Sequence, residues 1–172
     1  VAGALMQIMT QTRWGELDYL IIDMPPGTGD IQLTLSQKFP VSGAVIVTTP
    51  QDIALADAKK GVEMFRKVNI PVLGMIENMS MHICSQCGHA EHIFGEEGAE
   101  RLAETYNTRV LGSLPLSKYI REMSDDGTPV VAADDCSEVS MMYRHAARNM
   151  AVALQRQTQQ APAAPVIQIS DE

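Results

Sequence analysis

Short apolar runs alternate with segments of helical character along most of the chain. The apolar runs are of the kind expected for parallel strands buried on both faces, and they occupy residues 19–22, 43–50, 72–77 and 109–114. Helices are expected within residues 1–15, 30–38, 52–68, 95–106, 117–123 and 137–156. This alternation predicts βαβ units, and therefore an α/β fold with a mainly parallel sheet flanked by helices.

Two of the expected helices carry a clear apolar stripe. The first begins near Asp52, a plausible N-cap, and is stopped by Asn69 and Pro71. Its stripe consists of Leu55, Ala58, Val62 and Phe65. The last helix carries Val139, Met142, Tyr143, Ala146, Met150 and Ala153 on one face. Such stripes predict that both helices pack against the sheet.

The first apolar run leads directly into an acid and a glycine-rich loop, in the string LDYLIIDMPPGTGD at 17–30. Ligands bind beyond the carboxyl ends of strands in open α/β sheets, so Asp23 is a candidate to hold magnesium, directly or through water. The glycines, with Gly27 first, let backbone N–H groups approach a phosphate, and Asp30 is expected to cap the next helix. A simple turn is the alternative. The complete string favours a nucleotide site.

The segment 78–93 breaks the alternation, because it is rich in Met, His and Cys and has no consistent period. We expect a functional loop or small insertion there. Cys84 and Cys87 are spaced so that both thiolates can face one metal or cluster from a tight turn. An iron–sulfur cluster usually needs four thiolates, and a symmetric dimer would supply two from each subunit.

Zinc is the competing hypothesis for this segment. His82, His89 and His92 flank the cysteines, so a Cys2His2 site could close within one chain. A thioredoxin-like dithiol is disfavoured, because such a CxxC starts a helix after an early strand. No role is assigned to Cys136.

Composition and charge exclude several functions. The 172 residues suit one domain, expected at 1–156 with its metal loop at 78–93, whereas 157–172 lack a stripe and are expected to be mostly disordered. A net charge of −8 argues against nucleic-acid binding. No apolar run is long enough to span a bilayer, so no membrane partner is expected and the cytoplasm is the default location. The chain begins at Val1 within a helical pattern, which suggests a fragment.

Four strings carry a resemblance to a known family: LIIDMPPGTGD at 20–30, TTPQDIALADAKKG at 48–61, GMIENMS at 74–80 and CSQCG at 84–88. With them the chain resembles the Mrp/ApbC iron–sulfur cluster carriers, P-loop ATPases related to MinD, ParA and the nitrogenase iron protein. The resemblance covers about residues 1–155. The first string is shared with the wider ATPase group, whereas ENMS combined with CxxC is specific to the carriers.

The resemblance implies roles for five positions. Asp23 looks like the Walker B acid that supports magnesium, and Gly27 looks like the amide donor of the switch segment that senses the γ-phosphate of ATP. Asn78 matches the residue that recognises adenine, although a turn residue after a strand is the simpler alternative. Cys84 and Cys87 match the pair that binds a [4Fe–4S] cluster bridging a homodimer. The implied function is ATP-dependent transfer of that cluster to apoprotein recipients, and no catalytic residue is assigned.

The chain departs from the family pattern in one large respect. No GxxxxGK[ST] or GKGGVGKS-type string occurs in the 172 residues, so the P-loop, its lysine and the N-terminal P-loop strand are missing. We therefore expect no ATP hydrolysis by this polypeptide alone. In the family the missing strand lies beside the one that ends at Asp23, so its loss predicts a gap or open edge in the sheet.

Two other functions remain open from the sequence. A partitioning ATPase of the MinD/ParA type needs no CxxC, and MinD-like members end in an amphipathic membrane helix. The tail here contains Pro162 and Pro165 and lacks a basic amphipathic stripe, which disfavours that function. A zinc-stabilised binding module without catalysis is the other.

Overall fold

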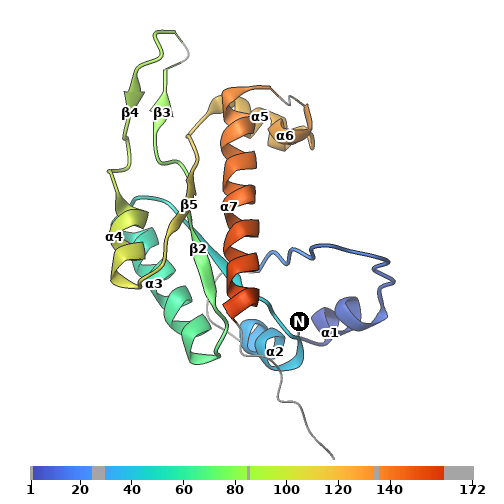
Figure 1. Ribbon diagram of the computed structural model, residues 1–172. Coiled ribbons are helices and arrows are strands. Elements are labelled where there is room, and N and C mark those ends of the chain that lie inside the picture. The colour runs from blue at the N-terminus through green and yellow to red at the C-terminus, as the bar shows by residue number, and fades with distance from the viewer. Residues whose placement is uncertain (1, 25–29, 85, 134–135, 161–172) are drawn as a thin grey trace, which may run out of the picture.

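The sheet is parallel and three-stranded in the computed structural model, which describes residues 2–24, 30–84, 86–133 and 136–160 (Figure 1). Its strands are β1 (Ala44–Thr48), β2 (Val72–Glu77) and β5 (Val110–Ser113), in the order β1-β2-β5. Met75 of β2 pairs with Ile46 on one side and Val110 on the other. Because all three strands run the same way, their carboxyl ends meet at one edge, as the apolar runs predict.

Helices cover both faces of this sheet. α3 (Asp52–Lys67) and α4 (Gly98–Thr105) pack on one face, whereas the long α7 (Glu138–Gln160) crosses β2 and β5 on the other (Figure 1). The first face forms a core of Ile46, Ala58, Val62, Met75, Ala99, Ala103 and Tyr106, and the second a core of Leu73, Leu111 and Ala153. Gly112 lets α7 approach closely, since a Cβ there would come within 2.8 Å of that of Ala146.

The remaining elements are short. They are α1 (Ala2–Gln11), α2 (Asp30–Lys38), β3 (His82–Ile83), β4 (Ala90–Glu91), α5 (Lys118–Asp125) and α6 (Val130–Ala133). All six expected helices are present, with shifted ends: Gln51 rather than Asp52 is the N-cap of α3, and α7 continues four residues beyond 156 into the expected tail. The short helix α6 was not expected from the sequence. The expected functional loop or small insertion at 78–93 contains the antiparallel pair β3–β4. Residues 161–172 lie outside the described part.

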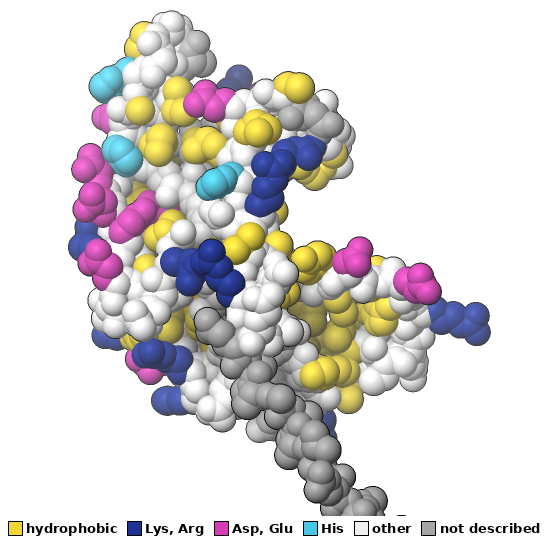
Figure 2. Space-filling view, viewed as in Figure 1, with side chains coloured by type: hydrophobic (Ala, Val, Ile, Leu, Met, Phe, Trp, Pro, Cys, Tyr) yellow, Lys and Arg dark blue, Asp and Glu magenta, His cyan; other side chains and the backbone are white. Residues whose placement is uncertain are grey.

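The prediction of a buried strand at 19–22 is wrong for this structure. Residues 17–24 form neither helix nor strand, and Leu17 is 52% and Ile21 71% exposed. The segment lies beside α1 and across α7 from the β3–β4 hairpin, where apolar side chains reach the surface (Figures 1 and 2). A parallel strand is stable only when a neighbour satisfies its backbone groups, and among the described residues nothing pairs with this segment. Within the described residues, β1 is an edge strand with β2 as its partner; the expected gap beside the strand ending at Asp23 stays a prediction, because residues 19–22 do not join the sheet.

Adjacent residues of β1 have opposite environments, because side chains alternate along a strand. Ile46 points into the core beneath α3 and is 7% exposed, whereas Val47 is 62% exposed on the face that α7 leaves uncovered. The second face of the sheet is therefore only partly covered in this chain.

The contrast between Ile46 and Val47 predicts different costs for the same truncation. Ile46→Ala should lower the free energy of unfolding by about 2–5 kcal/mol, because it leaves a cavity in the core. Val47→Ala should cost no more than about 1 kcal/mol, the range of strand propensity. Urea unfolding followed by circular dichroism measures both. Equal losses for the two variants would show that β1 is not packed as described.

Candidate functional site

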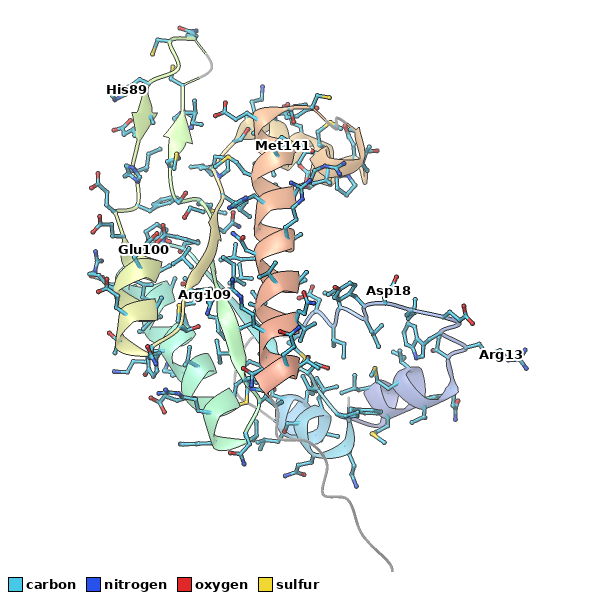
Figure 3. All side chains as sticks on the ribbon, viewed as in Figure 1. Arg13, Asp18, His89, Glu100, Arg109 and Met141 are labelled. Atoms are coloured by element: carbon cyan, nitrogen blue, oxygen red, sulfur yellow. The ribbon has the colours of Figure 1, made fainter. Side chains whose placement is uncertain are left out.

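The candidate metal residues lie on a hairpin that projects from the carboxyl end of β2. β3 and β4 pair antiparallel, with His82 opposite Glu91 and Ile83 opposite Ala90. Figure 1 shows the hairpin extending beyond the body of the molecule, and Figure 3 shows His89 near its far end. The two cysteines therefore lie away from the hydrophobic core and are open to a partner.

A tight turn organises the CxxC sequence. The Cys84 N–H donates to the His89 carbonyl at 2.9 Å, and the Gly88 N–H donates to the Cys84 carbonyl at 2.9 Å. Gly88 has φ +72°, a conformation that glycine adopts without steric cost. The turn leaves Cys84 partly buried and Cys87 exposed.

The same turn stabilises a thiolate at Cys84. Backbone N–H groups of Gln86 and Cys87 donate to its sulfur and, with the Cys87 thiol, hold the pKa of the Cys84 thiol below its ordinary value. Consecutive backbone N–H groups that converge on one atom form an anion-binding concavity. Thiolates are the species that bind metals, so the turn favours the ionised form that a cluster requires.

Two of the neighbouring histidines are hydrogen-bonded to backbone carbonyls through Nδ1. His82 Nδ1 lies 3.2 Å from the Leu116 carbonyl oxygen, and His92 Nδ1 lies 2.8 Å from that of Ser80. Within the described residues, no three His, Cys, Asp or Glu side chains are placed to hold one metal ion. The described side chains are therefore not arranged as a Cys2His2 site within one chain, although the Nδ1 hydrogen bonds leave each Nε2 free.

Asn78 lies at the base of the hairpin, immediately after β2. Its N–H donates to the Thr48 carbonyl at 2.7 Å, which extends the β1–β2 pairing by one residue. Its side-chain Oδ1 accepts a 3.0 Å hydrogen bond from the N–H of Met79, which has φ 56°. The side chain is half-buried at the edge of the sheet where α/β proteins bind ligands.

The other two expected nucleotide residues are not assembled with Asn78. Asp23 is exposed and outside any strand, and Gly27 lies outside the described residues. Figure 3 shows the chain that precedes Asp23, marked by Asp18, on the opposite side of α7 from the hairpin. The structure thus connects Asn78 with the cysteines and leaves Asp23 apart from them.

Glu77 is a buried acid that the sequence analysis missed. It ends β2, is 3% exposed, and accepts a 2.8 Å hydrogen bond from the Ala99 N–H through Oε1. Burial raises the pKa of the Glu77 carboxyl although the Ala99 N–H opposes the rise; nearby Glu100 adds to it and His92 opposes it. The available signal was an acid closing the otherwise apolar strand VLGMIE.

Comparison with known proteins identifies the family. Residues 1–151 match the family model described as ParA: NUBPL iron-transfer P-loop NTPase. The chain belongs to this family. It is 66% identical over 147 residues to an iron–sulfur cluster carrier protein of Pseudomonas fragi, covering 86% of this chain and 51% of that protein.

Further members of the family come from other bacteria and from animals. A carrier protein of Escherichia coli K12 is 61% identical over 151 residues, covering 88% of this chain and 41% of that protein. The mouse iron–sulfur cluster transfer protein NUBPL is 56% identical over 147 residues, covering 86% and 46%. The chain therefore spans about half the length of the curated relatives it matches.

Solved structures agree with the fold of the family. A nucleotide-binding protein of Archaeoglobus fulgidus in complex with ADP is 40% identical, with a TM-score of 0.65, covering 73% of this chain and 52% of that one. The MinD cell division ATPase of Pyrococcus furiosus is 20% identical, with a TM-score of 0.62, covering 88% and 56%. The second similarity shows the fold alone.

The hydrogen bonds at the Cys84 sulfur predict the pH dependence of its reactivity. In reduced, metal-free protein, alkylation of Cys84 should have its midpoint at lower pH than that of an ordinary cysteine, because the hydrogen bonds to its sulfur lower the pKa of the thiol. Gly88→Ala should raise this midpoint, because alanine at positive φ is strained and loosens the turn. Peptide mass spectrometry at a series of pH values measures both, with Gly3→Ala in α1 as the matched control. A midpoint that is unchanged by Gly88→Ala would contradict this role of the turn.

Proposed function

We propose that this chain supplies the cluster-binding part of an ATP-dependent iron–sulfur cluster carrier. The observation that carries the proposal is the turn at Cys84 and Cys87, which stabilises a thiolate and presents both sulfurs on a projecting hairpin. The names of the matched relatives support the same function.

The cluster in this proposal is a [4Fe–4S] cluster shared by a homodimer. Each subunit contributes Cys84 and Cys87, because one chain offers two suitably placed thiolates and such a cluster takes four. A two-fold axis through the hairpin tips would supply the set without further ligands. The cluster is cargo that passes to apoprotein recipients.

The nucleotide part of the proposal assigns Asn78 to adenine, with Asp23 and Gly27 serving magnesium and the γ-phosphate. The position of Asn78 beyond a parallel strand supports this assignment. For Asp23 to join it, residues 19–22 would have to enter the sheet beside a further strand, and the longer relatives have additional length that could provide one. We place the complete carrier in the cytoplasm, in line with its bacterial relatives.

The partitioning alternative receives less support. The similarity to MinD rests on the fold alone, and such an ATPase has no use for the CxxC turn. As a separate observation, no helix among the described residues has the length and apolarity needed to cross a bilayer.

Anaerobic reconstitution tests the cluster. Wild-type protein should become brown and bind about two iron atoms and two labile sulfides per chain, as expected for a [4Fe–4S] cluster shared by two subunits. Cys84→Ala and Cys87→Ala should each abolish the colour. Cys136→Ala, which removes an exposed cysteine elsewhere, should leave it unchanged. Zinc without iron or sulfide in anaerobically purified wild-type protein would refute the cluster and favour a zinc module.

Phosphate release tests the nucleotide part. The 172-residue chain should show no magnesium-dependent ATP hydrolysis above background, because it lacks the lysine and loop that neutralise the phosphates. Turnover that is abolished by Asp23→Ala and retained by Asp18→Ala would contradict this expectation. Asp18 is a suitable control because it is an exposed acid on the same segment.

A further inference from the structure

Glu77 is buried where a charged group is costly. It follows the apolar residues of β2 and is 3% exposed, and a carboxylate in such a place needs hydrogen-bond donors. The donor is not on a neighbouring strand. It is the N–H of Ala99, at 2.8 Å, in the first turn of α4, with the Gly98 N–H also acting on the carboxylate.

Through this hydrogen bond, the Glu77 side chain on β2 caps the N-terminus of α4. The residue before α4, Glu97, has φ 56° and makes no side-chain cap. The first N–H groups of a helix have no partner within the helix and favour negative charge, so Glu77 fits them in both respects. The start of α4 is also tightly packed, since a Cβ on Gly98 would come within 2.9 Å of the Pro50 carbonyl oxygen.

The residues joined by this bond bracket the whole hairpin. The chain leaves the sheet immediately after Glu77 and passes through Cys84 and Cys87. It returns to the body of the molecule at Gly98, where α4 begins. Nearer the base than the β3–β4 pairing, the two legs are also linked by a hydrogen bond between His92 Nδ1 and the Ser80 carbonyl oxygen, at 2.8 Å. Ser80, 2% exposed, is itself fixed because its N–H and Oγ both donate to the Leu114 carbonyl.

We infer that Glu77 is a positioning residue that fixes the cysteine hairpin, through its hydrogen bond with Ala99, in a set orientation to Asn78. The inference rests on the proposed function, because the orientation matters only if Asn78 binds nucleotide and the cysteines bind the cluster. Asn78 is held to β1, and its neighbour Glu77 is held to α4. A movement of the backbone at Asn78 or Glu77 therefore also moves the base of the hairpin.

Hydrogen exchange of the metal-free chain tests the anchor directly. Glu77→Met removes the acceptor at similar size and should speed amide exchange in residues 80–92 by about tenfold or more. Glu77→Gln keeps an acceptor oxygen and should remain close to wild type. The matched control is Glu104→Met, which replaces an exposed acid on α4, the helix that contains Ala99. Exchange in the Met variant equal to that in the control would refute the anchor, and equal acceleration in the Gln and Met variants would refute the role of the hydrogen bond.

A second pair of variants covers the case in which Glu77→Met does not fold. His92 is exposed, so His92→Phe should fold while losing the link between the legs. His92→Asn places an amide near the Nδ1 position and should preserve the link. In wild-type background the Phe variant should exchange faster than the Asn variant within residues 80–92. Identical exchange in these two variants would refute a hairpin held at its base.

The reconstituted cluster provides the functional readout. Visible circular dichroism reports the arrangement of the ligands, and it should change in Glu77→Met while the iron content at saturation stays the same. The Gln variant should restore the wild-type spectrum. An unaltered spectrum in a folded Met variant would refute the positioning role. Failure of wild-type protein to bind iron would refute the proposed function, and the exchange data would still decide whether Glu77 anchors the hairpin.

Discussion

The parallel pairing of β1 with β2 is the constraint on which the rest of the structure depends. Met75 is fully buried at the centre of the sheet, and the register places Thr48 beside Glu77. That register brings the Asn78 N–H to the Thr48 carbonyl and starts the hairpin at a fixed point. It also aligns Glu77 with the first turn of α4, which packs on the same face as Ile46. The candidate site therefore takes its geometry from the core.

The sequence predicted the strands that are short apolar runs and the helices that carry an apolar stripe. β1, β2 and β5 are short apolar runs, with β2 covered on both faces and β1 covered chiefly on the face beneath α3, and α3 and α7 carry stripes that match their packing. The run at 19–22 has the same local pattern but remains outside the sheet. A strand is defined by its neighbour, and an apolar pattern cannot report whether that neighbour is present. The apolar pattern therefore indicates that a segment favours a strand, but it does not show whether another strand is available to pair with it.

The candidate site was predictable in chemistry and only partly in geometry. The CxxC spacing and the strand that ends before Asn78 can both be recognised from the order of residue types in the sequence. The hairpin strands are too short to show a period of two, so β3 and β4 could not be found. Glu77 was missed for a different reason. Its importance comes from burial and from a partner 22 residues away, and neither follows from an acid at the end of a strand.

The electrostatics of the turn explain why such a hairpin suits a shared cluster. The chain is acidic, and Figure 2 shows acidic side chains along the side formed by α4 and the base of the hairpin. In the sequence that covers these elements, Glu91, Glu96 and Glu104 are exposed. Bringing two copies together would concentrate four thiolates near this negative charge, and distant cations could not offset it at ordinary ionic strength. The N–H groups of Gln86 and Cys87 stabilise negative charge at the Cys84 sulfur itself, at hydrogen-bond distance, where salt screens little. Each hairpin therefore carries its own local stabilisation of the Cys84 thiolate, and in the proposed dimer this stabilisation would be present at each of the two turns.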